Sequence, residues 1–213
     1  MLGFGAYGEV SEFEFNGKKL AVKCDRSGDK YPDAFDESRK KDAEREFHFL
    51  IKAYPDEGPY ALQHMEVGKY LDHHYSYRMV MPLIPGVRLH ELVYSLNDPV
   101  KIGQLFFAVA FELNRLHRAG IIHGDIRASN ILALEKPGGG FTIHFIDFGF
   151  AANVGETAPR FSASNEYCAP ERSQAPASRF TDVYALARTF EFCLSNVKHL
   201  ELSDKTTVMA TIR

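Results

Sequence analysis

A polar segment at residues 123–132, which reads His-Gly-Asp-Ile-Arg-Ala-Ser-Asn-Ile-Leu, constrains this chain more than any other feature. Before it, across residues 99–118, apolar side chains recur at spacings of three and four, which predicts a helix buried along most of one face. After it, two short apolar segments at 131–134 and 141–146 flank a Pro-Gly turn and predict a pair of strands. The polar segment is therefore a loop between a buried helix and a strand pair.

The first part of the chain predicts strands with one helix among them. Alternating residues on both sides of Asn16-Gly17 predict a hairpin, because this dipeptide favours a tight turn between strands. Residues 25–35 are polar and predict a loop, and a helical period then runs from 36 to 53. A second strand pair is predicted at 65–72 and 77–83. The helix is expected to bury three residues on one face: Phe47, Leu50 and Ile51.

The strand pattern ends at three chain-breaking residues, Pro82, Pro85 and Gly86. We place a hinge there, so that a strand-rich lobe at 1–84 precedes a helix-rich lobe at 85–213. In the second lobe, residues 150–178 are rich in small residues and predict a long irregular segment. A last helix is predicted from about residue 181 to residue 194. The expected fold class is α+β.

The charge and the cysteines exclude several kinds of protein. With 25 basic and 28 acidic residues the net charge is −3, which gives no general attraction to nucleic acid or to an anionic membrane. The sequence has no run of about 18 apolar residues, the length that indicates a spanning helix. Cys24, Cys168 and Cys193 lie far apart without metal-ligand spacing, which indicates a reducing compartment. We therefore expect a cytoplasmic protein.

Gly3, Gly5 and Gly8, followed by Val10, form a G-x-G-x-x-G-x-V pattern before the first hairpin. Glycines let the backbone N–H groups of a turn approach phosphate oxygens, since no Cβ stands in the way. A dinucleotide-binding turn would need a helix directly after the glycines, whereas a strand follows here. The pattern alone is weak, and a flexible N-terminal tail is the alternative.

Lys23 lies on a predicted strand 15 residues after Gly8, where its ammonium group could reach phosphates. A lysine in that role needs a carboxylate to orient it, and the helix at 36–53 offers Glu44 and Glu46. We favour Glu46, because Leu50 then lies on the same helix face one turn later. Glu44 remains the alternative.

Asp125, Asn130 and Asp147 form the set with the most specific spacing, since Asn130 and Asp147 follow Asp125 by 5 and 22 residues. An aspartate beside an acceptor hydroxyl can orient the hydroxyl and take its proton. An asparagine and a second aspartate can hold a magnesium ion against phosphates, because Mg²⁺ prefers oxygen ligands. His123 is expected to be a buried scaffold residue and not the base.

These motifs resemble those of the eukaryotic-type protein kinase superfamily over residues 2–195. They follow the family's order, which is a glycine-rich loop, a strand lysine, a helix glutamate, a catalytic loop, Asp147-Phe148-Gly149, Ala169-Pro170-Glu171 and the helix-opening Asp182. The resemblance implies a bilobal fold with a shortened C-lobe, and the use of ATP with Mg²⁺ or Mn²⁺. It implies these roles: Asp125 as the catalytic aspartate, Asn130 and Asp147 as metal ligands, and Lys23 and Glu46 as the activating ion pair.

The same resemblance implies a set of nucleotide contacts. The adenine ring would lie between three apolar residues, Val10, Ala21 and Leu132. Met81 would be the gatekeeper, and the backbone of Leu83 or Ile84, in the hinge that begins at Pro82, would hydrogen-bond the adenine edge. The regulatory spine of the family would comprise Leu50, His123 and Phe148, anchored by Asp182.

Ser164 and Arg127 bear on the identity of the acceptor. By its similarity to the family, Ser164 occupies the position where serine/threonine kinases carry a hydroxyl that contacts the catalytic aspartate. Arg127 occupies the position usually held by lysine, and it would neutralise the γ-phosphate with a different geometry. The expected activity is therefore phosphorylation of serine or threonine in a protein substrate.

The chain departs from the family pattern at Gly124 and at its C-terminal end. Gly124 stands where the family has an arginine that pairs with a phosphorylated activation loop, so we expect activity without phosphorylation of Thr157, Ser162 or Ser164. Only 31 residues follow Asp182, as in the minimal effector kinases of the OspG and HopBF types that bacterial pathogens inject into host cells. The expectation is a monomer, either a fragment or a minimal kinase; an effector would be secreted into the host cytoplasm and act on a host protein.

Other functions stay open from the sequence. Small-molecule phosphotransferases of the aminoglycoside-kinase kind also use a His-Gly-Asp loop followed by an asparagine and a later aspartate. A pseudokinase that serves as a binding module is the non-enzymatic alternative, although every catalytic position is filled. Transfer of a nucleotide instead of a phosphoryl group would be a further reaction.

Overall fold

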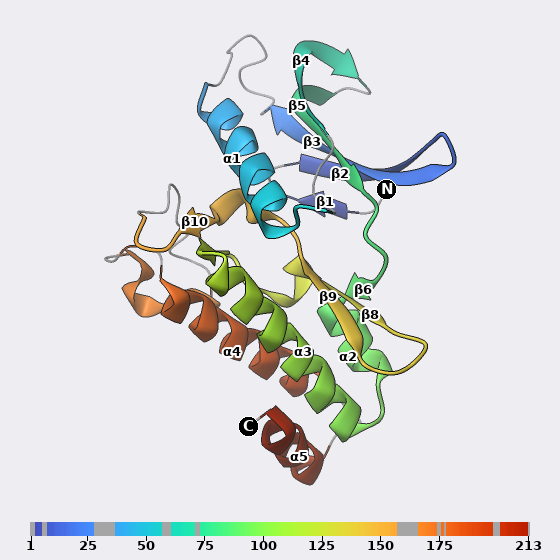
Figure 1. Cartoon of the computed structure of the whole chain (residues 1–213), viewed down its shortest axis with the longest axis vertical. Helices are drawn as coiled ribbons and strands as arrows, with labels where there is room; N and C mark the ends of the chain where they lie inside the picture. The colour runs from blue at the N-terminus through green and yellow to red at the C-terminus, as the bar shows by residue number, and fades with distance from the viewer. Residues whose placement is uncertain are drawn as a thin grey trace. The chain divides into compact units, whose positions relative to one another are not determined.

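The chain divides into two compact units, Met1–Ile84 and Pro85–Arg213. The computed structural model describes residues 3–5, 8–27, 37–56, 61–70, 73–156, 166–173, 176, 178–197 and 201–212 (Figure 1). In the described residues, the first unit has one sheet and one helix, and the second has two smaller sheets and the other helices. Each unit is treated by itself below.

The first unit is built on a five-stranded antiparallel sheet with the order β1-β2-β3-β5-β4. Asn16 and Gly17 connect β2 to β3 with φ angles of 52° and 72°, the left-handed conformations that a two-residue hairpin turn requires. The hairpin predicted from this dipeptide is therefore confirmed. The strands are β1 (Gly3–Gly5), β2 (Gly8–Phe15), β3 (Lys18–Ser27), β4 (Ala61–Tyr70) and β5 (His73–Pro82).

Three of these strands are longer than the sequence predicts, and β4 covers Ala61–Tyr70 instead of 65–72. Residues 25–27 were predicted as loop but belong to β3, and β5 begins at His73 instead of residue 77. Arg26 pairs with Tyr75 and Ser27 pairs with His74, beyond a bulge at Cys24 and Arg26. Pairing with a neighbouring strand can extend a strand through polar residues, which local sequence preference does not reveal.

The helix α1 (Glu37–Ala53) packs against β4 and β5. Its buried side is formed by Glu46, Phe49, Leu50 and Ala53, at the spacings of three and four that define one helix face. The prediction that Ile51 belongs to the buried face is wrong, since Ile51 is 41% exposed. The buried face is rotated so that a carboxylate, Glu46, occupies one of its positions.

The second unit is mainly helical. Its elements in chain order are β6 (Val87–Arg88), α2 (Leu89–Ser95), α3 (Pro99–Arg118), β7 (Ile121–Ile122), η1 (Ala128–Asn130), β8 (Ile131–Glu135), β9 (Phe141–Phe145), η2 (Phe148–Phe150), β10 (Ala152–Asn153), η3 (Pro170–Ser173), α4 (Arg179–Ser195) and α5 (Leu202–Ile212). Strands β6, β8 and β9 form one antiparallel sheet, and β7 pairs with β10.

The core of the second unit lies around α3, which runs beside α4 in Figure 1. Asp98 caps the helix, because its side chain accepts hydrogen bonds from the N–H groups of Val100 and Lys101. Phe106 of α3 stacks on Phe190 of α4 with 4.0 Å between ring centroids. The fully buried apolar residues of α3 are Ile102, Leu105, Phe106, Val109 and Leu116.

The polypeptide enters the second unit through a glycine that no other residue could replace without strain. Gly86 has a φ of 134°, and a Cβ at this position would lie 2.9 Å from the carbonyl oxygen of Ala133. Because glycine has no side chain, β6 can pair with β8 immediately after the prolines that end the strand pattern of the first unit.

Two helices of the second unit were not predicted. Helix α2 has 7 residues, which is too short for its period to be recognised. Helix α5 packs against α3, and this contact buries Val208 completely. Which face of α5 is buried therefore depends on a helix that is distant in the sequence. Helix α4 begins at Arg179 and therefore extends two residues further toward the N-terminus than predicted.

The α+β class is confirmed, with antiparallel strands in the first unit and helices dominating the second.

Within the described ranges, the helices are all too short or too polar to cross a lipid bilayer.

Cys193 offers a test of the packing between α4 and its neighbours. Its side chain is fully buried, and burial raises the pKa of the thiol from 9.0 to about 12. The folded state therefore keeps a proton that the unfolded state loses between pH 9 and pH 12, so this residue's contribution to stability declines as the pH rises through that window. We expect the stability advantage of wild type over Cys193→Ala in urea unfolding to shrink by about 1 to 2 kcal/mol between roughly pH 8 and pH 10.5. A pH-independent difference would contradict this account.

Candidate active site

A buried carboxylate holds the loop at residues 123–130 in place. Asp182 Oδ2 accepts a hydrogen bond from the backbone N–H of His123 at 2.8 Å, and Asp182 Oδ1 accepts one from the backbone N–H of Gly124 at 2.9 Å. His117 Nε2, on α3, lies 2.9 Å from Asp182 Oδ2. Asp182 is only 1% exposed, so these partners replace water around its charge. One side chain of α4 thereby fixes the beginning of the loop.

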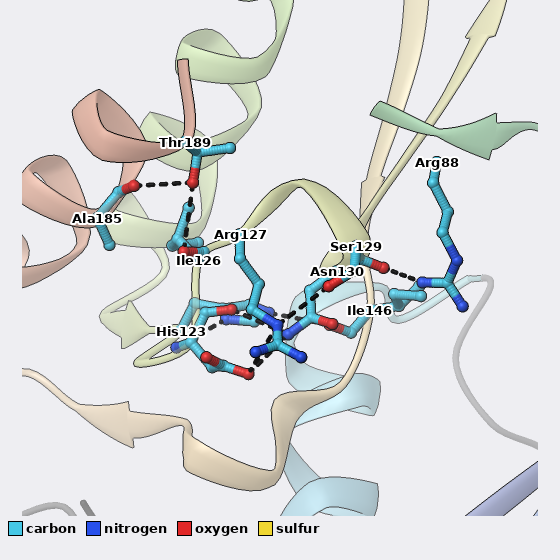
Figure 2. A network of polar contacts seen from close by, with 10 residues as sticks. Arg88, His123, Ile126, Arg127, Ser129, Asn130, Ile146, Ala185 and Thr189 are labelled. Atoms are coloured by element: carbon cyan, nitrogen blue, oxygen red, sulfur yellow. Dashed lines mark hydrogen bonds and ion pairs between the residues drawn. The ribbon is translucent and has the colours of Figure 1, made fainter. Parts of the chain in front are cut away.

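His123 is a scaffold residue in this structure, as expected from the sequence. Its ring is fully buried and lies 4.8 Å from the ring of Phe148, centroid to centroid. Its Nδ1 accepts the N–H of Asp125 at 3.3 Å, and its Nε2 lies 3.2 Å from the carbonyl oxygen of Ile146. These partners assign the proton to Nε2, which donates to Ile146. The imidazole thereby links the loop to the strand that precedes Asp147 (Figure 2).

Asn130 fixes the carboxylate of Asp125. Its Nδ2 donates to the backbone oxygen of Asp125 at 3.0 Å and to Asp125 Oδ2 at 2.8 Å. Asn130 is 6% exposed, whereas the side chain of Asp125 keeps 13% of its surface accessible. The amide therefore positions an aspartate that solvent can still reach.

Asn130 is also connected to the segment that carries Asp147. The backbone N–H of Ile146 donates to the carbonyl oxygen of Asn130 at 2.9 Å, which continues the pairing of β8 with β9. Asp147 itself has φ 66° and ψ 73°, a left-handed conformation that is uncommon for a residue with a side chain. Such strain costs on the order of 1–3 kcal/mol and often marks functional positions.

Arg127 and Ser129 lie on the solvent side of the same loop. Arg127 Nε donates to Ser129 Oγ at 3.0 Å and lies 3.9 Å from Asp125 Oδ2. From the opposite direction, Arg88 Nη1 donates to the carbonyl oxygen of Ser129 (Figure 2). The Arg127 side chain is 45% exposed, so its remaining donors can reach a ligand. Two arginines thus fix the middle of the loop, and one of them neighbours the aspartate.

The oxygen atoms at Asn130 and Asp147 suit a magnesium ion. Both donors of the Asn130 amide are directed at Asp125, which leaves the amide oxygen as the ligand atom. No group of three or more His, Cys, Asp or Glu side chains in the described part of the chain could hold a metal by itself. Mg²⁺ needs no such group, because it is commonly bound through one or two carboxylates together with phosphates and water.

In the first unit, the structure pairs Lys23 with Glu46. Lys23 Nζ donates to Glu46 Oε1 at 2.7 Å and to Oε2 at 2.8 Å. The side chains are 20% and 10% exposed, so the pair is much less screened by solvent than a surface ion pair. Glu44 is exposed and lies on nearly the opposite side of α1 from Glu46.

Four of the residues predicted to contact the nucleotide share one face of the sheet in the first unit: Val10, Ala21, Lys23 and Met81. Val10 pairs with Lys23, and Ala21 pairs with Met81. Because side chains alternate along a strand, positions 21 and 23 of β3 and their partners point to the same side. Met79, the partner of Lys23 on β5, belongs to this face as well and is 3% exposed. Met79 was not predicted from the sequence, although its two-residue spacing from Met81 indicates a common face.

The hinge backbone is partly used within the first unit. The N–H of Leu83 donates to the carbonyl oxygen of Lys19 at 3.3 Å and so extends the pairing of β3 with β5. The backbone of either Leu83 or Ile84 was predicted to hydrogen-bond the adenine edge. Because the N–H of Leu83 is bonded to Lys19, the N–H of Ile84 is the group left for that role. Leu132 lies in the second unit, on β8 opposite His144.

The glycine pattern forms a hairpin. Gly3 pairs with Val10 and Gly5 pairs with Gly8 in the ladder between β1 and β2. A strand follows the last glycine, as the sequence predicts. The tip of the hairpin, residues 6 and 7, lies outside the described residues.

Gly124 has a φ of 80°, and its N–H is one of the two bound by Asp182. A side chain at this position would be strained, because residues other than glycine rarely adopt that angle. Thr157, Ser162 and Ser164 lie outside the described residues, so the predictions for them have no structural counterpart here. Ala169 is buried and Glu171 is exposed at the start of η3.

Besides Met79, three residues of this site were not predicted from the sequence. His117 carries a usable signal, because it falls four residues after the buried Leu113 on the apolar face of α3. Arg88 and Ser129 carry no such signal, since their contacts join separate parts of the chain or depend on the local turn.

Comparison with known proteins identifies the family. The family model described as "Protein kinase domain" matches residues 1–212. The chain belongs to the protein kinase family.

Similar proteins come from bacteria and animals. The chain is 28% identical to "Probable serine/threonine-protein kinase PknB" of Corynebacterium glutamicum over 50% of its length. It is 30% identical to "Hormonally up-regulated neu tumor-associated kinase" of Mus musculus over 80% of its length. It is 26% identical to "Probable serine/threonine-protein kinase zyg-1" of Caenorhabditis elegans over 87% of its length. The matches span only 17%, 23% and 25% of these relatives.

Proposed function

We propose that this protein kinase transfers the γ-phosphoryl group of ATP to serine or threonine hydroxyls of a protein substrate. The observation that carries the proposal is the hydrogen bond from Asn130 Nδ2 to Asp125 Oδ2, at 2.8 Å, next to the strand pair that leads to Asp147. This arrangement orients one aspartate and presents oxygen ligands beside it.

Asp125 would act on the acceptor hydroxyl. Asn130 holds one of its carboxylate oxygens, and the carboxylate keeps some exposure to solvent, so it can accept a hydrogen bond from the hydroxyl and take its proton. Arg127, with its Nε 3.9 Å from that carboxylate, would direct its outer donors at the γ-phosphate. Asn130 and Asp147 would hold Mg²⁺, which when bound neutralises phosphate charge.

Lys23 would bind the α- and β-phosphates of ATP. The bidentate contact with Glu46 fixes its ammonium group on the face of the sheet that Val10, Ala21 and Met81 share. These apolar residues would contact the adenine ring in the first unit, with Leu132 as the corresponding contact from the second. The N–H of Ile84 would meet the adenine edge, because that of Leu83 is bonded to Lys19.

If Lys23 binds the phosphates and Glu46 orients it, substitution of either residue should lower kcat/KM. We expect Lys23→Met to lower kcat/KM by roughly 10²-fold, as the loss of one positioned donor to transferring charge commonly does. Glu46→Gln keeps a hydrogen-bond acceptor but loses the charge, and a loss of about tenfold, or 1.4 kcal/mol, is expected. Lys19→Met on the same strand is the matched control, since Lys19 is 65% exposed and pairs with Glu12. An equal effect of the Lys19 and Lys23 substitutions would contradict the assignment.

The enzyme is proposed to be active without phosphorylation of its activation segment. Support comes from Gly124, which supplies no cation to pair with a phosphate and has a backbone angle unsuited to a side chain. Replacing Thr157 and Ser162 together by alanine should leave kcat within about twofold of wild type. A loss of about tenfold, or 1.4 kcal/mol, would contradict this prediction.

The proposed acceptor is tested by labelling proteins with γ-labelled ATP and Mg²⁺ and then analysing the phosphorylated amino acids. Phosphoserine or phosphothreonine is expected, and phosphotyrosine alone would overturn the assignment of the acceptor. Transfer to an aminoglycoside or another small hydroxyl compound, with none to protein, would favour a small-molecule phosphotransferase. ATP binding without any transfer would favour a pseudokinase.

An effector role is a narrower form of this proposal, with a host protein as the substrate and the host cytoplasm as the site of action. Incubation with γ-labelled ATP and a lysate of host cells would then label a small number of host proteins. A protein kinase without this role would show no such preference over a lysate of the source organism.

A further inference from the structure

The outer face of α3 carries a line of six exposed residues, which we call the α3 stripe: Val100, Gln104, Phe107, Phe111, Asn114 and Arg118. At about 100° per residue, these positions fall within an arc of roughly 80° and so form a straight line along the helix. Phe107 and Phe111 lie one turn apart and are 55% and 65% exposed. The opposite side of α3 forms the core of the second unit.

Two adjacent phenylalanines at the centre of a solvent-facing helix surface are unusual. The outer face of an amphipathic helix is normally polar, and a contiguous apolar patch commonly marks a contact surface. Ala108 and Ala110 border the phenylalanines, and such small side chains let a second helix approach closely. The centre of the stripe therefore suits a helix as its partner.

The four inner residues of the stripe have the same order of types in both directions, amide, phenylalanine, phenylalanine, amide, whereas its ends differ, with Val100 at one and Arg118 at the other. Each pair of positions, 100 and 118, 104 and 114, and 107 and 111, is equally distant from residue 109. Consider a second α3 that lies antiparallel against the stripe, with a two-fold axis that passes between the helices at the level of residue 109. This arrangement would set each Phe107 against Phe111 of the second copy. The same axis sets Gln104 against Asn114, two amides that can hydrogen-bond to each other. A two-fold contact requires such a self-complementary surface.

The charges at the two ends of α3 are also complementary. Near its N-terminus, Lys101 is paired with Glu135 at 2.6 Å, and the full negative charge of Asp98 exceeds the partial positive charge of the helix end that it caps, so this end is negative. Near its C-terminus, Arg115 is paired with Glu112 at 2.7 Å, so Arg118 leaves that end positive. Neither Asp98 nor Arg118 forms an ion pair with the residues that the structure describes. An antiparallel arrangement brings the negative end of each helix to the positive end of the other.

We propose that the α3 stripe is the contact surface of an antiparallel homodimer, with a second copy of this chain as its partner. This proposal replaces the monomer expected from the sequence, and it does not depend on the reaction that the protein catalyses. One pair of helices covers less surface than a standard interface, so the dimer is expected to be weak and concentration-dependent.

The proposal is tested first by measuring the mass of the protein in solution between about 1 and about 100 µM, by sedimentation or light scattering. The mass should rise from that of one chain toward that of two. Phe107→Glu combined with Phe111→Glu should keep the protein at the mass of one chain across the range. The control is Phe180→Glu on α4, where the side chain is 78% exposed, and it should leave dimerisation unchanged. A single-chain mass for wild type at the highest concentration, or dimerisation that survives the double substitution, would overturn the proposal.

The antiparallel geometry is tested by crosslinking. Positions 104 and 114 lie about 15 Å apart along one helix, so cysteines there cannot bridge within a chain. The double variant Gln104→Cys and Asn114→Cys should form a disulfide-linked dimer under mild oxidation, while either single variant should not exceed the wild-type background. Efficient crosslinking by the single variants would indicate a parallel contact and overturn the proposed geometry. Circular dichroism of each variant distinguishes loss of dimerisation from loss of folding.

Discussion

Asp125→Asn is expected to lower kcat by roughly 10²- to 10⁴-fold, the contribution typical of a positioned acid–base group. The substitution keeps the size of the side chain, and an amide oxygen can still accept the hydrogen bond from Asn130 Nδ2 that is 2.8 Å long in the structure. What it removes is the negative charge and the ability to take a proton. The loss should therefore appear in kcat, with the KM for ATP changed little.

The matched control is Asp56→Asn, because Asp56 is an exposed aspartate in the turn after α1. Its substitution should leave the rate of phosphoryl transfer unchanged. Steady-state kinetics at several ATP concentrations separates the two parameters. If Asp125→Asn retained more than about a tenth of the wild-type kcat, Asp125 would not be the group that acts on the acceptor.

Asp182→Ala is expected to have the largest effect on stability. It removes the acceptor of two backbone N–H groups, those of His123 and Gly124, and the partner of His117. A buried donor left without an acceptor costs about 1–3 kcal/mol, so the free energy of unfolding should fall by about 3–5 kcal/mol. That is a large share of the 5–15 kcal/mol typical of folded domains.

Urea unfolding measures this effect, with Glu191→Ala as the control on the same helix. Glu191 is 65% exposed and pairs with Arg188, so its loss should cost no more than about 1 kcal/mol. Asp182→Asn keeps one acceptor oxygen and should fall between the two, which provides a measurable variant if Asp182→Ala does not fold. Equal stabilities of Asp182→Asn and wild type would contradict the role given to the carboxylate.

The features that the sequence predicts well are those with a local physical cause. The hairpin at Asn16-Gly17 follows from the turn that this dipeptide prefers, and α3 follows from a long helical period. The fold class follows from the order of such segments. Because the functional motifs are local in the sequence, the loop from His123 to Asn130 could also be singled out before its geometry was known.

The features that could not be predicted depend on contacts between distant residues. The extension of β3 and β5 rests on their pairing with each other, and α5 depends on its packing against α3. The exposure of Ile51 results from the way α1 rotates to bury Glu46. Within the site, the bond from Arg88 to Ser129 joins positions 41 residues apart, and Arg88 belongs to no recognised motif.

The most direct test of the central claim compares wild type with Asp147→Asn in the presence of Mg²⁺, a protein acceptor and labelled ATP. Asparagine is the suitable replacement, because it tolerates the left-handed backbone found at Asp147 better than alanine does. The account predicts that wild type transfers label to protein from γ-labelled but not from α-labelled ATP, and that Asp147→Asn transfers little. Undiminished transfer by Asp147→Asn, or label transferred from the α-position, would contradict it.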